Sequence, residues 1–254
     1  MNALVLGGAS WNRMVTVPSL PGPTPQTMVA TATHEAIGSS GAGKALNLRR
    51  LGWDVTLWAL LGDDEHGAKV RSGLAGAGVR LLAEHDPAGT MQHVNIMEPH
   101  GERISIFANP GSLDLAVDHA ALVPEAVGAD LVVLTIFEHC RGFLPLLAEA
   151  GVELWIDIHD YDGANPYHED FVEAASYLQL SSIALPDWRS FAAARVAAGC
   201  RAVICTHGSA GASVLTDAGW VEVEAVRALR IVDANGAGDA FFAGFATGWA
   251  LGLD

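Results

Sequence analysis

The sequence has few positive charges. Lys and Arg together number 14, against 29 Asp and Glu, which gives a formal net charge of −15 in 254 residues. Binding to nucleic acid or to an anionic membrane depends on basic side chains. The composition therefore argues against both partners, and we expect an acidic protein of the cytoplasm.

Cysteines are scarce and long apolar runs are missing. Cys140, Cys200 and Cys205 form no CxxC pair and lie in or beside apolar stretches, so we expect buried side chains in a reducing compartment. No apolar run approaches the roughly 20 residues that a membrane helix needs. The N-terminal MNALVLGG has no basic segment before its apolar run, which predicts a strand rather than a signal peptide.

Half of the residues are hydrophobic, enough for one domain, residues 1–254, with a substantial core. Continuous apolar strands alternate with helices, which favours the α/β class: a doubly wound, mostly parallel sheet flanked by helices. The predicted strands are 3–8, 54–62, 79–85, 130–137, 152–158, 177–181 and 201–208. The predicted helices are 41–52, 64–78, 141–151, 186–199 and one that begins near residue 239.

Two β-rich insertions, at about residues 12–36 and 89–108, do not fit this layer. The first holds four prolines, and the second contains two short strands joined by the turn PHGE. We expect the insertions to pair with each other as a small β lid. Because short strands with one apolar face are poorly stable alone, we also expect the lid to form a homodimer across a two-fold axis.

The stretch GSSGAGKA, residues 38–45, has part of a phosphate-binding P-loop pattern. Gly38, Gly43 and Lys44 fall on the P-loop spacing, but the next position is Ala45 instead of Ser or Thr. In a P-loop that hydroxyl binds the magnesium ion carried by the nucleotide, and a methyl group cannot replace it. A chain with 28 glycines also produces such spacings by chance. We therefore interpret this stretch as a glycine turn of another kind.

A second glycine turn lies near the end of the sequence, in RIVDANGAGDAFFAGFATGWALG (230–252). Ile231 and Val232 end an apolar strand, Asp233 follows, and Asp239 begins a helix after the glycine turn. Such a turn lets backbone N–H groups converge at a helix N-terminus, where negative charge is favoured. An anion cradle with an acid in it suits phosphoryl transfer, in which an Asp takes the proton of the acceptor hydroxyl.

The motif DANGAGDAF (233–241) resembles the C-terminal signature of the PfkB, or ribokinase-like, family of carbohydrate and nucleoside kinases. The resemblance extends along essentially the whole chain. It implies ATP- and Mg²⁺-dependent phosphorylation of a hydroxyl on a sugar or sugar-like molecule. By the match, Asp239 is the catalytic base, and the anion hole is formed by the backbone of Asn235, Gly236, Ala237 and Gly238.

The resemblance also implies a nucleotide side and a substrate side. THGSAG (206–211) is similar to the nucleotide-side turn, with Thr206 and Gly208 near the phosphates and Gly211 at the next strand. GSSGAGKALN aligns with the glycine motif that binds sugar hydroxyls and hinges the lid. The implied substrate-side residues are Asn12, Gly38, Ser39, Gly41, Gly43, Lys44 and Asn109.

Several positions depart from the family pattern. Asn12 replaces the Asp that grips two substrate hydroxyls, which weakens each bond because the charge is lost. Ser39 replaces the second motif glycine, and Gly43 replaces the motif Asn. Lys44 offers a contact to an anionic substrate, although a solvated lysine in the first helical turn is the default expectation.

The expected metal site is poorly supported. The family's Asn-x-x-Glu, which organises magnesium waters, should follow strand 177–181, where only Ser181, Ser182 and Asp187 are present. Asp157, with His159 nearby, is a secondary candidate ligand. The sequence stops at Asp254, where relatives usually add a helical stretch beside the adenine pocket, so either the chain is longer or that pocket is open.

Two other functions remain open. A nucleoside kinase of the same family needs an aromatic stacking platform in the lid, for which Trp11 and Phe107 are the candidates. A non-catalytic sugar-binding relative is suggested by the residues at positions 12 and 43. Asp239 with an intact glycine turn argues against this second alternative, because a binding protein needs no base.

Overall fold

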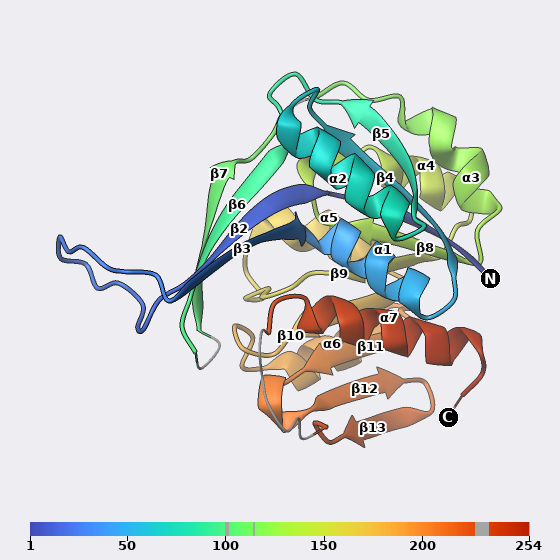
Figure 1. Ribbon diagram of the computed structural model, residues 1–254. Helices are drawn as coiled ribbons and strands as arrows, with labels where there is room; N and C mark the ends of the chain where they lie inside the picture. Colours follow the sequence, from blue (N-terminus) through green and yellow to red (C-terminus); the bar gives the residue numbers. More distant parts are fainter. Residues whose placement is uncertain (100–101, 114, 227–233, 254) are drawn as a thin grey trace. The chain divides into compact units, whose positions relative to one another are not determined.

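The computed structural model of the protein, shown in Figure 1, describes residues 1–99, 102–113, 115–226 and 234–253. The chain divides into two compact units. The first comprises residues 1–7 and 116–228, and the second comprises residues 8–115 and 229–254. Each unit therefore combines segments that are far apart in the sequence.

The first unit contains a twisted sheet whose strands follow the order β13-β12-β11-β10-β9-β8-β1. Pairing is parallel from β1 to β11 and antiparallel for β12 and β13. The inner strands are buried along almost their whole length, as expected for parallel strands covered on both faces. The strands are β1 (Asn2–Leu6), β8 (Leu131–Thr135), β9 (Leu154–Asp157), β10 (Tyr177–Ser181), β11 (Ala202–Thr206), β12 (Ala212–Thr216) and β13 (Gly219–Val223).

Short helices connect these strands. The predicted helices at 141–151 and 186–199 correspond to α4 and α6, each two residues shorter at both ends. A strand after Gly211 is implied by the resemblance and corresponds to β12, whereas β13 and two short helices were not predicted, because their apolar patterns are too brief to show a period. The helices of this unit are α3 (Val123–Val127), α4 (Phe143–Glu149), α5 (Glu169–Ala174) and α6 (Trp188–Ala197).

The second unit contains a parallel strand pair, β4 (Asp54–Leu61) and β5 (Arg80–His85), and three helices. Asp64 caps α2, since its carboxylate accepts the N–H of Gly67 at 2.7 Å. Trp53 is fully buried, and its indole N–H donates to Thr247 of α7 at 2.8 Å, which ties the end of α1 to α7. The helices are α1 (Ser40–Arg50), α2 (Glu65–Gly76) and α7 (Ala237–Ala250).

The same unit carries a separate four-stranded sheet, the lid. Its order is β3-β2-β6-β7, with β2 and β6 parallel and both outer pairs antiparallel. The two β-rich insertions thus pair with each other, as the sequence predicts. The strands are β2 (Ser10–Thr16), β3 (Ala32–Gly38), β6 (Met91–Met97) and β7 (Arg103–Asn109).

The predicted fold class is confirmed. Nine strands in the described residues belong to the large, mostly parallel sheet, and four belong to the lid. A single domain over residues 1–254 stays a prediction. No helix in the described ranges is both long and apolar enough to span a bilayer.

Candidate active site

The C-terminal glycine turn leads into α7, the longest helix of the described chain. Gly236 has φ 74°, a left-handed conformation that glycine adopts without steric cost, and it caps the helix. Asp239 lies in the first turn, where the positive end of the helix dipole favours its carboxylate. Residues 236–238 are exposed. The predicted strand end at Ile231 and Val232, with Asp233, lies outside the described residues.

Asp239 is bound by side chains from the first turn of α1, which packs against α7 in the same unit. Lys44 Nζ lies 2.5 Å from Asp239 Oδ1 and 2.6 Å from Ser40 Oγ. The Ser40 hydroxyl also donates to Oδ1, at 3.0 Å. Lys44 is fully buried, so the expectation of a solvated lysine is wrong. Lys44 lies on the side of α1 that faces α7, where the carboxylate of Asp239 stabilises the buried ammonium group.

Gly43 leaves the space that the other carboxylate oxygen occupies. A β-carbon at this position would lie 2.3 Å from Asp239 Oδ2, far inside van der Waals contact. The glycine that replaces the motif Asn therefore allows Asp239 to approach the backbone of α1. Sequence reasoning missed the role of Ser40, whose partner is 199 residues away and leaves no local signal.

Ser39, just before α1, has a strained backbone. Its φ of 72° and ψ of 147° belong to a region that glycine occupies readily and other residues avoid. Its Oγ is buried and makes no hydrogen bond within the described part of the chain. Glycine, which the family resemblance implies at this position, would adopt this backbone conformation without strain, whereas Ser39 adopts it with strain.

The lid presents a polar face that carries Asn12. Asn12 is 6% exposed and accepts the hydroxyl hydrogen of Ser10 at 2.7 Å. A β-carbon at Gly38 would lie 2.0 Å from Asn12 Nδ2, so the glycine of the substrate motif makes room for this amide. Gly41 is buried in the first turn of α1.

Further side chains of β6 and β7 share the face of Asn12 because strand register aligns them. His93 pairs with Asn12 across β2 and β6, and its ring centroid lies 4.0 Å from that of Phe107 of β7, with the two rings tilted by 57°. Burial, and secondarily the charge of Arg103, lower the pKa of His93, which favours the neutral ring. His93 Nε2 is buried with no hydrogen-bond partner among the described residues. Asn95 lies next on this face and accepts the hydroxyl hydrogen of Ser105 at 2.6 Å.

The lid also contacts the turn before α7. Arg103 of β7 donates to the Asn235 side-chain oxygen, and the Asn235 amide lies 3.0 Å from Met97 Sδ. The predicted anion-hole residue is thus joined to the polar face of the lid through its side chain.

Asn109 serves the base of the lid. Its amide nitrogen donates to the carbonyls of Ala88 and Thr90, at 3.0 and 3.2 Å, and its oxygen accepts the N–H of Gly111 at 3.0 Å. Backbone groups of residues 88, 90 and 111, the hinge at the base of the lid, therefore form hydrogen bonds with both the nitrogen and the oxygen of the Asn109 amide.

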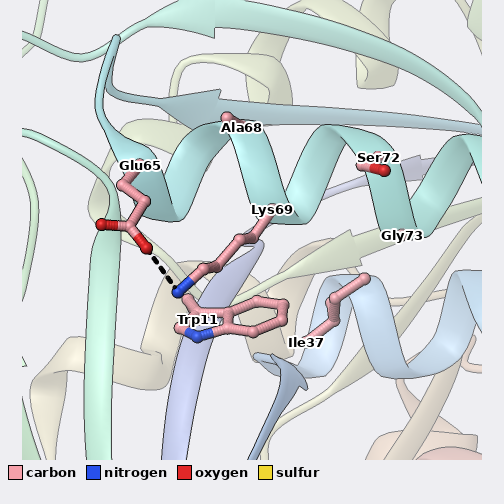
Figure 2. A pocket seen from close by; sticks show the side chains of 7 residues that line it. All are labelled: Trp11, Ile37, Glu65, Ala68, Lys69, Ser72 and Gly73. Atoms are coloured by element: carbon pink, nitrogen blue, oxygen red, sulfur yellow. Dashed lines mark ion pairs between the residues drawn. The ribbon is translucent and has the colours of Figure 1, made fainter.

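Trp11 lies on the lid face opposite to Asn12 and cannot serve as a stacking platform beside it. As Figure 2 shows, it borders a groove of about 590 Å³ against α2, together with Ile37 of β3. Lys69 extends over the indole ring and pairs with Glu65 at 2.8 Å. Of the two aromatic candidates, only Phe107 shares the polar face.

The predicted nucleotide-side turn lies in the first unit. Thr206 ends β11 and donates weakly to the Leu180 carbonyl at 3.4 Å. Gly208 and Gly211 both have positive φ, and a β-carbon at Gly211 would lie 2.0 Å from the Val223 carbonyl oxygen. His207 within this turn was not predicted. Its ring is held between the hydroxyls of Ser182 and Ser213, each at 2.8 Å, and lies 4.6 Å from the Trp188 ring.

Asp157 is buried at the end of β9. Its carboxylate accepts the backbone N–H of His159 at 2.9 Å and the amide of Gln179 at 3.3 Å. Within the described ranges, no three His, Cys, Asp or Glu side chains gather in a way that could hold a metal ion. The chain therefore offers Mg²⁺ no ready-made carboxylate cluster there.

All three cysteines are buried, as the sequence predicts, and their thiols are free. Burial raises the pKa of Cys140 and of Cys205 to about 12, and it raises the pKa of Cys200 as well. Thiols with such pKa values are poor nucleophiles near neutral pH.

Comparison with known proteins decides the family. The sequence matches the model of the pfkB family of carbohydrate kinases over residues 4–254. The chain belongs to the pfkB family. It is 33% identical over 259 aligned positions to an acarbose 7(IV)-phosphotransferase from Actinoplanes sp., covering 99% of this chain and 86% of that protein.

Solved structures agree. A microbiome-derived acarbose kinase is 29% identical, with a TM-score of 0.85 over 96% of this chain and 84% of the other. A nucleoside kinase from Burkholderia thailandensis in complex with inosine has a TM-score of 0.77 at 22% identity, covering 99% and 85% of the two chains, and this likeness concerns the fold alone.

Membership of the pfkB family confirms the predicted activity class. The enzyme is a carbohydrate kinase that takes its phosphoryl group from ATP. The structure also argues against a P-loop at residues 38–45. The stretch begins at the last residue of lid strand β3, and its lysine, Lys44, pairs with Asp239.

Proposed function

We propose that this pfkB kinase phosphorylates a carbohydrate hydroxyl with Asp239 as the general base. The observation that carries the proposal is the position of Asp239. It begins α7 directly after the exposed glycine turn 236–238, and the same unit holds the polar face of the lid. A base, an anion cradle and a hydroxyl-binding surface are what phosphoryl transfer to a sugar requires.

In the proposed reaction, Asp239 accepts the proton of the acceptor hydroxyl. The acceptor oxygen then forms a bond to the γ-phosphorus of ATP, the bond to the β-phosphate oxygen breaks, and ADP leaves. The backbone of Asn235, Gly236, Ala237 and Gly238 stabilises the negative charge on the transferred group. The N-terminal end of α7 adds its dipole to this stabilisation.

The polar face of the lid supports a carbohydrate acceptor. Asn12 offers both a donor and an acceptor, and His93 Nε2 has no partner there within the described residues. A sugar hydroxyl bound at this face would satisfy His93, and an aromatic ring such as Phe107 stacks well on a sugar or a base. We propose that Gly38, Ser39, Gly41 and Gly43 shape the substrate side around them. Asn109 is assigned to the hinge.

Relatives suggest which acceptors to test first. Two of them, at 33% and 29% identity, are named for acarbose. We propose an oligosaccharide or a similarly polyhydroxylated molecule as the acceptor class.

For the nucleotide, we propose that Thr206, Gly208 and Gly211 contact the ATP phosphates. Magnesium chemistry in such kinases neutralises charge on the phosphates. Because the described residues gather no carboxylate cluster, we propose that the phosphates and water would supply most ligands of Mg²⁺, with Asp157 as a candidate ligand from the chain.

We further propose a homodimer through the lid and a cytoplasmic location. The lid face opposite to Asn12 carries Val94, Ile96, Ile104 and Ile106, and the last two are 38% and 46% exposed. Such an apolar stripe on a small sheet favours a partner surface. Three unpaired cysteines and a need for ATP fit the cytoplasm.

One observation favours a second function, that of a nucleoside kinase. Phe107 is 53% exposed and its ring lies against that of His93 at a tilt of 57°, so a nucleobase could pack beside this aromatic pair. The non-catalytic alternative is disfavoured by membership of a kinase family.

The decisive experiment measures ADP release with ATP, Mg²⁺ and a panel of acarbose, maltose oligosaccharides, monosaccharides and inosine. Asp239→Asn should lower turnover by about 10²–10⁴-fold, the usual effect of losing a general base. Calorimetry should show nearly unchanged ATP binding in the same variant. An Asp239→Asn protein that turns over at the wild-type rate would refute the assigned role.

A matched variant tests the rejected P-loop. Lys44→Ala should keep its ATP affinity, because the proposed phosphate site lies at residues 236–239. In a P-loop, the lysine binds the β- and γ-phosphates, and its removal cripples nucleotide binding. Loss of ATP affinity in Lys44→Ala, with normal turnover in Asp239→Asn, would place the phosphates at residues 38–45 instead of 236–239.

A further inference from the structure

The side chain of Lys44 is charged and completely buried. An ammonium group removed from water is costly unless opposite charge and hydrogen bonds compensate it. Here Asp239 Oδ1 lies 2.5 Å away, Ser40 Oγ lies 2.6 Å away, and the Phe242 ring centroid lies 4.9 Å away. The carboxylate and the ring face both stabilise the cation.

The two oxygens of Asp239 have different surroundings. Oδ1 accepts hydrogen bonds from both Lys44 and Ser40. Oδ2 lies 2.3 Å from the position that a β-carbon of residue 43 would occupy, whereas the bonds from Lys44 and Ser40 go to Oδ1. The carboxylate is thus fixed by one oxygen, and the other has capacity to accept a proton.

We propose that Lys44 is a positioning residue for the phosphoryl transfer. With Ser40, it holds Asp239 Oδ1 so that Oδ2 takes the proton of the acceptor hydroxyl. The inference rests on the proposed role of Asp239 as the base. Lys44 itself does not touch the substrate, which distinguishes it from a lysine that binds an anionic acceptor.

The physical reason is the sensitivity of proton transfer to geometry. A carboxylate in the first turn of a helix can adopt several rotamers, and only some of them direct an oxygen to the acceptor. A displacement of about 1 Å in a reacting group can cost on the order of 10²-fold in rate. Two hydrogen bonds to one oxygen and close contact with Gly43 restrict Asp239 to one orientation.

The test compares activity with stability in Lys44→Met. Methionine has a similar unbranched shape, but removing one partner of a buried ion pair leaves Asp239 without its counter-charge, so we expect a lower Tm. Per folded molecule, we expect a kcat lower by about 10–100-fold, with KM values for ATP and acceptor within about two-fold of wild type. A lysine that served only folding would lower Tm and leave kcat per folded molecule unchanged, which would overturn the proposal.

Lys69→Met is the matched control. Lys69 lies on α2 beside Trp11, is about one-third exposed and pairs with Glu65 and Glu35, away from Asp239. The Lys69→Met variant also loses a lysine and its ion pairs, but it should keep the wild-type kcat. An equal loss of kcat in Lys69→Met would show that the effect of Lys44→Met is not specific.

Gly43→Ala provides a second route that keeps the lysine. The added methyl group would lie 2.3 Å from Oδ2 and must displace the carboxylate. We expect kcat to fall while ATP affinity measured by calorimetry is preserved. Wild-type kcat in both Gly43→Ala and Lys44→Met would refute the inference, whether or not either variant differs in stability.

Asp239→Asn distinguishes the proposed base role of Asp239 from the proposed positioning role of Lys44. If it is inactive and Lys44→Met is fully active, the proposed base stands and the positioning role fails. If Asp239→Asn is fully active, the proposed base itself is wrong.

Discussion

The amide of Asn12 fills the space above Gly38. Any side chain at position 38 would collide with it, because a β-carbon there would lie 2.0 Å from Asn12 Nδ2. The lid strands β2 and β3 are therefore fitted to each other at these two residues. The contact also fixes the amide that replaces the family's Asp.

Asn12→Asp should strengthen binding of a neutral sugar acceptor. The carboxylate can still accept the Ser10 hydroxyl, and it forms charge-assisted bonds to sugar hydroxyls. Such bonds exceed neutral ones by roughly 1 kcal/mol, or several-fold in affinity. The measurement is the KM for a working acceptor and its Kd with a non-hydrolysable ATP analogue. Unchanged affinity for every acceptor would mean that position 12 does not contact the substrate.

Ser39→Gly should stabilise the protein. Glycine removes backbone strain of about 1–3 kcal/mol and a buried hydroxyl without a described partner, against about 0.5–1 kcal/mol of added unfolded-state entropy. We expect a net gain of about 1 kcal/mol, or a Tm higher by about 2–4 °C. Calorimetry measures both.

The control for this prediction is Ser72→Gly, at an exposed position inside α2. It should destabilise by about 0.5 kcal/mol, because the backbone there is helical and glycine only adds entropy to the unfolded chain. Equal changes in both variants would contradict the strain at Ser39.

The sequence reveals the layers of the fold because its apolar periods are long and regular. Strand 177–181 is predicted with the bounds of β10, and the two insertions pair as expected. Strand β13 escapes prediction since it is five residues long and mostly exposed. Short, half-exposed strands carry little apolar signal.

The site is less accessible from sequence than the fold. Asp239 and its turn can be found from motif spacing. The burial of Lys44 cannot, because lysines are mostly exposed and its carboxylate partner lies 195 residues away. The unpartnered Nε2 of His93 likewise depends on the register between β2 and β6, which no local pattern specifies.

Ile106→Lys should shift a lid-mediated dimer towards the monomer. A charge on the apolar lid face opposite to Asn12 would have to be buried in the dimer interface, which lowers the affinity between the two protomers by several-fold or more. Light scattering with size exclusion at micromolar concentration measures the mass. Val127→Lys, at a 60% exposed position of α3, is the matched control and should leave the mass unchanged. A wild-type monomer would refute the dimer.

Glu35 should contribute to stability above pH 4.5 and lose its contribution in acid. The Arg13 guanidinium, at 2.7 Å, and then the Trp11 indole lower the pKa of Glu35 from 4.5 to about 2. A carboxyl group whose pKa is lower in the folded state stabilises that state when ionised, and the effect is lost as the pH falls from 4.5 to about 2. Urea unfolding across this range should show a shallower pH dependence in Glu35→Gln. Superimposable curves for the two proteins would contradict this assignment.

The sequence separation of 195 between Lys44 and Asp239 also has a consequence for synthesis in the cell. At about 5–20 residues per second, the ribosome adds the carboxylate about 10–40 seconds after the lysine. Until then, the first turn of α1 lacks this contact. The compact unit formed by residues 8–115 and 229–254 can therefore close only after residues 229–254 have been synthesised, even where the intervening residues fold earlier.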